Sequence, residues 1–260
     1  MTYSVLYKNT KISYSVYSNG AAVVLLHGFL ENQTMWDYYI ADLSKTHQII
    51  TIDLLGHGDS ECLGYIHSMT TQAEMVYAVL QNLNVSSAVF IGHSMGGYVA
   101  LAFADSYKDF ITGLALLNST ALEDNHERKI NRNRAIKMAH NQYVALVTIS
   151  ISNLFSEINR VKMVSEIEIT KQEALKTPLQ GYIAAQEGMK IRKNTVSILQ
   201  KTSFKKLLIL GKKDGVLNFD ENKKQIANTN VQLIGLDGGH MSHIENKDEL
   251  KKVLLNFIKL

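Results

Sequence analysis

A serine between two glycines is the residue of this sequence best suited to nucleophilic chemistry. Ser94 lies in the pentapeptide GHSMG, residues 92–96, after an apolar run and before an alanine-rich segment with helical spacing. A strand–turn–helix with this pattern is typical of a sharp turn that exposes the serine hydroxyl. The free amides of the following helix would favour negative charge beside that hydroxyl. The alternative is a glycine-rich turn that serves helix–sheet packing and carries an incidental serine.

The segments around Ser94 alternate between short apolar runs and helical patterns. Continuous apolar runs are typical of strands buried on both faces, and strand–helix alternation indicates a mostly parallel sheet covered by helices. We therefore predict an α/β fold. The expected strands are 2–7, 13–17, 21–26, 48–52, 87–91, 111–117, 206–210 and 231–236, and the expected helices are 70–83, 95–105, 219–227 and 247–258.

Residues 120–201 depart from this alternation. They show consecutive helical patterns without a buried strand, over a length that a plain connection rarely reaches. We predict a helical cap at 120–201 that sits on a core formed by residues 1–119 and 202–260.

Four motifs in this order resemble the α/β-hydrolase superfamily: LHGF at 26–29, DLLGHGDS at 53–60, the turn at Ser94, and Gly239-His240. Within the superfamily the chain resembles the capped serine hydrolases, which include carboxylesterases, lyases and C–C hydrolases. The resemblance implies an α/β-hydrolase fold, in which a mostly parallel central sheet is flanked by helices and a helical cap is inserted after the sixth strand.

The resemblance also implies a catalytic triad in the chain order nucleophile, acid, histidine. Asp214 follows the 206–210 run and suits the acid, and His240 follows the 231–236 run and suits the base that a serine needs. Both would lie at the carboxyl edge of the sheet, where ligands bind in open α/β folds. The rival for the base is His243, and the rivals for the acid are Glu123, Asp124, Asp220 and Asp237.

An oxyanion hole is expected from two backbone amides. One is that of Met95, which follows the nucleophile, and the resemblance assigns the other to Phe29. The alternative for this second loop is that Gly28 merely ends a strand.

The substrate pocket is harder to predict. Trp36 and Tyr98 are aromatic and near the motifs, and the apolar segment 143–155, which contains Leu146 and Phe155, could roof the pocket or simply pack the cap on the core. The basic segment 127–137 contains arginines that would suit a substrate carboxylate. A solvated helix face is the commoner explanation of such a charge run.

These features predict a serine hydrolase that cleaves a small-molecule carboxylic ester through an acyl-enzyme. The alternatives are a C–C bond hydrolase or lyase on the same triad, a thioesterase, or a ligand-binding protein without catalysis. A serine at the turn argues against epoxide hydrolase and haloalkane dehalogenase chemistry, because those relatives carry aspartate there.

Composition narrows the remaining classes. Apolar residues make up 46% of the 260 residues and charged residues 20%, which is an ordinary globular mixture. A net charge of +3 gives no reason to expect nucleic acid or a membrane surface as partner. The single cysteine, Cys62, allows no intramolecular disulfide, and no histidine–carboxylate spacing suggests a metal. We expect no cofactor, no signal peptide, no membrane span and a cytoplasmic location, while the oligomeric state is left open.

Overall fold

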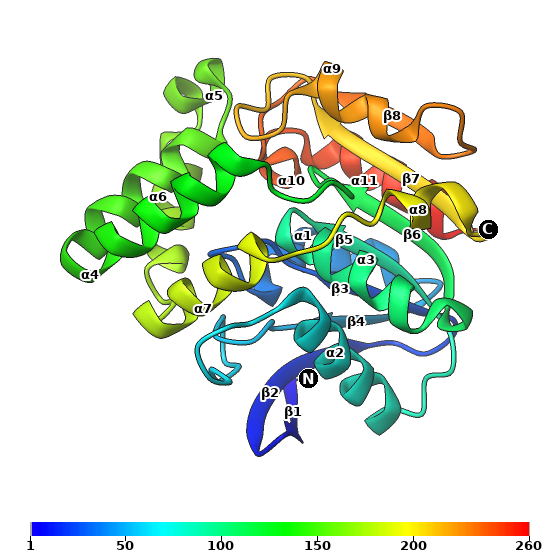
Figure 1. Ribbon diagram of the computed structural model, residues 1–260. Helices are drawn as coiled ribbons and strands as arrows, with labels where there is room; N and C mark the ends of the chain where they lie inside the picture. Colours follow the sequence, from blue (N-terminus) through cyan, green and yellow to red (C-terminus); the bar gives the residue numbers. More distant parts are fainter. Residues whose placement is uncertain (1, 260) are drawn as a thin grey trace.

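An eight-stranded sheet forms the centre of the computed structural model, which describes residues 2–259 (Figure 1). Its strand order is β1-β2-β4-β3-β5-β6-β7-β8. Only β1–β2 and β2–β4 pair antiparallel, and the other neighbours pair parallel. The strands are β1 (Thr2–Tyr7), β2 (Thr10–Tyr17), β3 (Ala22–Leu26), β4 (Gln48–Ile52), β5 (Ala88–His93), β6 (Ile111–Leu117), β7 (Lys205–Gly211) and β8 (Gln232–Leu236). The predicted mostly parallel α/β sheet is confirmed.

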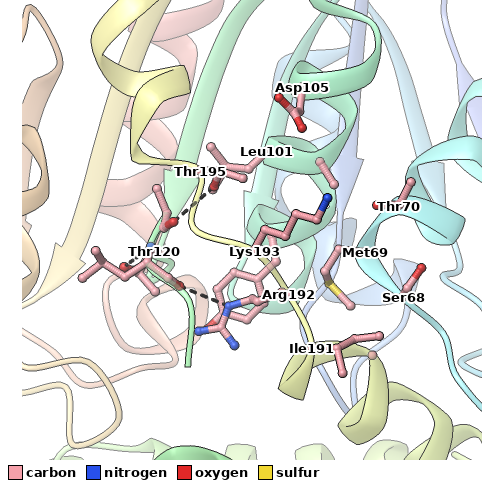
Figure 2. Close-up of a pocket in the computed structure, with 15 residues that line it drawn as sticks. Ser68, Met69, Thr70, Leu101, Asp105, Thr120, Ile191, Arg192, Lys193 and Thr195 are labelled. Carbon is pink, nitrogen blue, oxygen red and sulfur yellow. Dashed lines mark hydrogen bonds between the residues drawn. The ribbon is translucent and has the colours of Figure 1, made fainter. Parts of the chain in front are cut away.

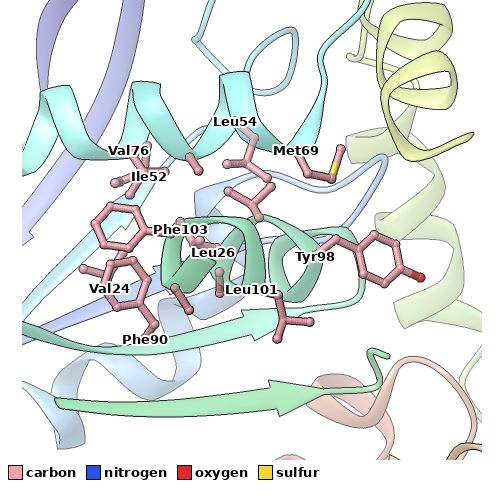
Figure 3. Close-up of a cluster of buried hydrophobic side chains, with 14 of the residues drawn as sticks. Val24, Leu26, Ile52, Leu54, Met69, Val76, Phe90, Tyr98, Leu101 and Phe103 are labelled. Atoms are coloured by element: carbon pink, nitrogen blue, oxygen red, sulfur yellow. The ribbon is translucent and has the colours of Figure 1, made fainter. Parts of the chain in front are cut away.

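The central strands are apolar at nearly every position because both faces of the sheet are covered. Along β3, Val24 and Leu26 enter one core cluster while Val23 and Leu25 enter the other, as the alternation of strand side chains requires. Helices α2 (Met69–Asn82) and α3 (Met95–Ser106) cover the first face. Figure 3 shows their side chains meeting those of the strands. Helices α1 (Asp37–Leu43) and α11 (Lys247–Ile258) cover the second face.

The sequence prediction missed the short helices η1 (Gln33–Trp36), α1, η2 (Lys108–Phe110) and α10 (Ser242–Glu245) of the core, and it predicted one continuous helix where two short ones occur. The 3-10 turn η1 leads into α1 and begins at Asn32, whose side chain accepts a hydrogen bond from the Thr34 amide. The predicted helix 219–227 is a single turn, α9 (Phe219–Asn222), followed by a 3-10 turn, η3 (Lys223–Ile226). Short helices carry too few apolar repeats for periodicity to detect them.

A helical insertion follows β6, as predicted. It comprises α4 (His126–Leu154), α5 (Glu157–Lys162), α6 (Val164–Ala174), α7 (Leu179–Lys190) and α8 (Val196–Lys201). Helices α4, α6 and α7 share a third apolar cluster that includes Val147, Ile151 and Tyr182, and Leu30 and Met241 from loops of the core pack into it. Helix α8 lies apart from them, beside α3 and η3, and its Ile198 and Leu199 pack into the core cluster of the first face (Figure 1). The division of the chain at residues 120 and 201 stays a prediction.

Among the helices of residues 2–259, none has both the length and the apolarity that crossing a bilayer needs.

The turn between β5 and α3 is packed so closely that glycine is required there. A Cβ at Gly96 would lie 2.3 Å from the Leu26 carbonyl oxygen, and one at Gly92 would lie 2.4 Å from the Gly96 oxygen. Backbone atoms at such distances cannot give way, so we expect Gly96→Ala to lower the free energy of unfolding by about 3 kcal/mol or more. Urea denaturation measures this.

A matched control for this substitution is Gly215→Ala. The nearest atom to a Cβ at Gly215 is 3.9 Å away, which is ordinary contact. Equal stability of the two variants would contradict the close-approach argument.

Candidate active site

Ser94 occupies a strained backbone conformation at the start of α3. Its φ is 47° and its ψ is −112°, a region that costs a non-glycine residue about 1–3 kcal/mol. Hydrogen bonds hold this turn from both sides. The Ser94 amide donates to the Leu117 carbonyl at 2.9 Å, and the Ser119 hydroxyl donates to the Ser94 carbonyl at 2.8 Å. The end of β6 therefore fixes the serine that β5 and α3 present.

Three predicted residues meet at the carboxyl edge of the sheet. His240 Nε2 lies 2.8 Å from Ser94 Oγ, and His240 Nδ1 lies 2.7 Å from Asp214 Oδ2. Asp214 follows β7 and His240 follows β8, and both side chains are buried. A base in contact with a serine, and oriented by a carboxylate, is the arrangement that activates a hydroxyl nucleophile.

The rival residues are engaged elsewhere. His243 Nε2 faces Glu31. Among the rival acids, Asp220 pairs with Lys223, Asp237 with Lys213, and Asp124 with both Arg132 and Arg192. Glu123 makes no hydrogen bond or ion pair with His240 within residues 2–259. The carboxyl group beside His240 is that of Asp214.

Asp214 is held in its ionised form. Its Oδ1 accepts from the amides of Val216 and Leu217 at 2.7 and 2.9 Å. Burial alone would raise the pKa of Asp214, but the attraction and hydrogen bond of His240 and these two amides outweigh it, and the pKa lies below its ordinary value. A permanent carboxylate is what keeps the Nδ1 proton on His240.

Asn118 is a positioning residue that the sequence prediction missed. Its Nδ2 donates to Asp214 Oδ2 at 3.2 Å and to the Gly239 carbonyl at 3.1 Å, and it therefore ties the acid to the loop that carries His240. Its place directly after the 111–117 strand, at the carboxyl edge of the sheet, was the available signal.

The two amides predicted to form the oxyanion hole both follow strands of the sheet, and their role stays a prediction. Met95 is the first residue of α3, so its amide has no partner within the helix. Phe29 follows β3 and lines the cavity that contains Ser94. Within residues 2–259, neither amide donates to a turn, loop or side-chain acceptor.

A buried ion pair between Glu31 and His93 connects the loop after β3, the end of β5 and the loop that carries His240. Glu31 Oε2 accepts from the Gly28 amide and from His93 Nδ1, each at 2.6 Å, and His93 Nε2 donates to the His240 carbonyl at 3.0 Å. Since both ring nitrogens of His93 face acceptors, the imidazolium form fits. Burial opposes both charges, yet mutual attraction lowers the pKa of Glu31 to about 2 and raises that of His93. The sequence prediction missed this pair, because nothing local brings residues 31 and 93 together.

The same cluster is the candidate for a metal. Among residues 2–259, Glu31, His93 and His243 form the group whose ligand atoms lie close enough together. Zinc bound to nitrogen and oxygen at about 2.0–2.1 Å would hold those atoms more than 3 Å apart. The observed 2.6 Å between Glu31 and His93 is a hydrogen bond instead. Hydrogen bonding therefore accounts for the Glu31–His93 contact, and His243 Nε2 lies 3.2 Å from the other oxygen of Glu31.

Buried neutral histidines predict a loss of stability in acid. Burial lowers the pKa of His57 and His243 to about 3, so the folded protein binds these protons less readily than the unfolded chain below pH 6.5. One pKa unit is worth 1.36 kcal/mol, so the free energy of unfolding should fall by roughly 2–4 kcal/mol from pH 7 to pH 5. His93 acts in the opposite direction, because its raised pKa contributes stability that is complete below pH 6.5 and is lost as the pH rises.

Urea denaturation at pH 7 and pH 5 tests this dependence. His57→Asn should reduce the difference between the two pH values, and the exposed His140→Asn should leave it unchanged. A free energy of unfolding that is the same at both pH values would contradict the prediction.

The cavity at Ser94 is small and largely apolar. It encloses about 120 Å³, and its lining includes Tyr98, Leu154, Met189 and Val216 beside His240. Of the four residues predicted to line the pocket, only Tyr98 does so. Trp36 is fully buried between the sheet and α1, while Phe155 and Leu146 pack within the cap cluster.

A second cavity, of about 180 Å³, lies between α2, α3 and the chain that follows α7 (Figure 2). It contains neither Ser94 nor His240, although Tyr98 lines both cavities. Arg192 crosses it, with its guanidinium 4.1 Å from the Tyr98 ring.

Comparison with known proteins agrees with this architecture. A family model described as "alpha/beta hydrolase fold" matches residues 21–247. The chain belongs to this family, which confirms the resemblance.

The individual relatives share between 22% and 31% of their residues with this chain over the matched regions. The 3-oxoadipate enol-lactonase 1 of Acinetobacter baylyi is 28% identical over 93% of this chain and 90% of that protein. An uncharacterized protein of Mycobacterium tuberculosis is 31% identical, but the match spans 41% of this chain and only 31% of that longer protein. Among solved structures, a thermophilic esterase from Thermogutta terrifontis, solved with malate bound, is 27% identical with a TM-score of 0.88, over 96% of this chain and 93% of that one. The enol-lactonase from Burkholderia xenovorans LB400 has a TM-score of 0.91 at 22% identity, over 99% and 100% of the chains, which is a likeness of fold.

Proposed function

We propose that this protein is a serine hydrolase that cleaves carboxylic esters through an acyl-enzyme. The observation that carries the proposal is the unbroken line of contacts from Asp214 to His240 and from His240 to Ser94, at 2.7 and 2.8 Å. It is supported by membership of the α/β-hydrolase fold family and by the esterase and lactonase names of the relatives.

In this mechanism His240 Nε2 takes the proton of Ser94 as the hydroxyl oxygen attacks the ester carbonyl. The carbonyl oxygen becomes negative and accepts hydrogen bonds from the Phe29 and Met95 amides, a contribution that is worth about 10²–10³ in turnover for each donor. His240 then protonates the departing alcohol. In the second half of the reaction it activates the water that releases the acid. The Asp214 carboxylate stabilises the imidazolium in both halves.

A lactone is the second candidate substrate. A lactone is an internal ester, and the same attack opens its ring without releasing a separate alcohol. The match to an enol-lactonase along nearly the whole chain favours this candidate over a thioester or a C–C bond.

A series of p-nitrophenyl esters from acetate to laurate, with dihydrocoumarin as a lactone, tests the proposal. Because the cavity is only about 120 Å³, we expect kcat/KM to be highest for acyl chains of about two to six carbons and to fall toward laurate. The rate at which a fluorophosphonate labels Ser94 should rise over the same pH range as kcat/KM, because both reactions need His240 to take the Ser94 proton. Well-folded protein that neither turns over these substrates nor reacts with the probe would contradict the proposal.

A further inference from the structure

Two arginines of the cap lie where the catalytic cavity meets an outer cavity of about 300 Å³. Arg128 and Arg132, together with Val216, line both cavities. The remaining lining of the outer cavity is Asn131, Ala135 and Gln186. No carboxylate lines the outer cavity among residues 2–259, so a ligand that reaches Ser94 through it meets a positive potential.

The inner cavity offers little to offset this charge. Glu31 is its only acidic lining residue among those that the structure describes. Its carboxylate already accepts from the Gly28 amide and from His93, and His243 faces its other oxygen at 3.2 Å. The imidazolium of His93 therefore balances the charge of Glu31. Arg128 has no carboxylate partner among residues 2–259, and Arg132 shares the carboxylate of Asp124 with Arg192.

Two of the three guanidinium nitrogens of Arg132 donate hydrogen bonds to other side chains, and the third is left for a ligand. Its Nε donates to Asp124, and its Nη1 donates to Gln186 Oε1 at 2.8 Å. Its Nη2 has no hydrogen-bond partner within residues 2–259. The side chain is only 16% exposed. A guanidinium fixed through two nitrogens, with the third directed to no protein acceptor, is preorganised for an anionic ligand.

The charge of Arg132 is also incompletely balanced. Asp124 pairs with Arg192 Nη1 at 2.7 Å as well as with Arg132, so one carboxylate serves two guanidinium groups. Arg192 does not line the catalytic cavity, and it donates to the carbonyl oxygens of Leu122 and Met189. The unbalanced positive charge is therefore available to a ligand at Arg132.

We propose that the substrate carries a carboxylate, which Arg132 binds while the ester or lactone carbonyl lies at Ser94. Arg128, whose Nη2 donates to the Val216 carbonyl, adds a second cation beside the path between the cavities. This inference rests on the proposed function and specifies its substrate class as acidic esters or lactones. For Arg128 and Arg132 it favours substrate binding over a solvated helix face, while Arg134 and Lys137 of the same basic segment are exposed and line neither cavity.

Two pairs of substrates test the proposal, with the carboxylate on the acyl side of the ester in the first pair and on the alcohol side in the second. One pair is 4-nitrophenyl hydrogen adipate and 4-nitrophenyl hexanoate, and the other is 3-carboxyphenyl butyrate and phenyl butyrate. In at least one pair we expect the wild type to favour the anionic ester by about 10-fold or more in kcat/KM. Arg132→Gln should lower kcat/KM for that anionic ester by about 10- to 100-fold, because a charge-assisted hydrogen bond is lost, and should change the neutral ester less than about threefold.

Companion variants separate binding from structure. Compared with Arg132→Gln, Arg132→Lys should restore part of the selectivity for the anionic ester, since lysine keeps the positive charge but lacks the planar set of guanidinium donors. Arg134→Gln removes the same charge from an exposed position of α4 that lines neither cavity, and it should leave the selectivity unchanged. The proposal is overturned if the wild type shows no anionic preference in either pair. It is also overturned if Arg132→Gln lowers both members of a pair equally, or if Arg134→Gln has the same effect.

Binding to Ser94→Ala separates this proposal from the proposed function. Calorimetry with the two anionic esters and their neutral counterparts needs no turnover. If the wild type hydrolyses none of the four esters, the proposed function fails. Tighter binding of an anionic ester by about 10-fold, abolished by the additional Arg132→Gln substitution, would still establish the anion site, and equal binding of anionic and neutral esters would refute it.

Discussion

Ser94→Ala is expected to lower kcat for p-nitrophenyl butyrate by about 10⁶, which is the order of loss when the nucleophile of a serine protease is removed. The reason is chemical, because alanine leaves His240 without a hydroxyl to deprotonate and no acyl-enzyme can form. The fold should persist, since no hydrogen bond within residues 2–259 other than that to His240 uses Ser94 Oγ. Steady-state kinetics and urea denaturation measure the two effects.

Ser106→Ala provides the matched control for this experiment. Ser106 is the last residue of the same helix and is exposed, so its substitution should leave both turnover and stability unchanged. If Ser94→Ala retained turnover of the wild-type order, the acyl-enzyme mechanism would be refuted. An inactive variant that is also unfolded would point to a structural role of the turn instead.

Asp214→Asn is expected to lower kcat by about 10⁴, as the corresponding exchange does in serine proteases. The amides of Val216 and Leu217 both donate to one side of the Asp214 carboxylate, so the asparagine oxygen must turn toward them. Its NH₂ group then faces His240 Nδ1, which can accept only if the ring proton moves to Nε2. In that tautomer the ring cannot accept the Ser94 proton, and KM should change much less than kcat.

The free energy of unfolding supplies a second readout for this variant. The new NH₂ group also faces the Nδ2 donor of Asn118, so Asp214→Asn should be less stable than the wild type by about 1–3 kcal/mol. Asp220→Asn is the control, because Asp220 is an exposed acid whose partner is Lys223. Asp214→Asn with undiminished kcat would exclude Asp214 as the acid that orients His240.

Several structural elements follow directly from the sequence. The strand 48–52 and the helix 247–258 have the predicted bounds, and the turn at Ser94 lies between a buried strand and a helix. These features depend on side-chain periodicity and on glycines at a close approach, which are local properties. The motif order was equally informative: Asp214 and His240, proposed from it, are the residues that contact Ser94 in the structure, and their catalytic roles stay predictions.

Other features were decided only by the tertiary structure. The Glu31–His93 pair joins residues 62 positions apart, and the His240–Ser94 contact spans 146 positions. Such contacts depend on the strand order and on which loops it brings to one edge of the sheet. Trp36 illustrates the same limit, because its nearness to a motif in sequence predicted the pocket, while the direction of η1 buried it under α1. The sequence by itself determined the fold and led to the prediction of Ser94, Asp214 and His240 as the reacting groups, since both depend on local pattern and motif order. The tertiary structure decided which charges surround those groups, because only the folded chain brings Arg132 to the cavity that contains Ser94 and places Asp124 beside it.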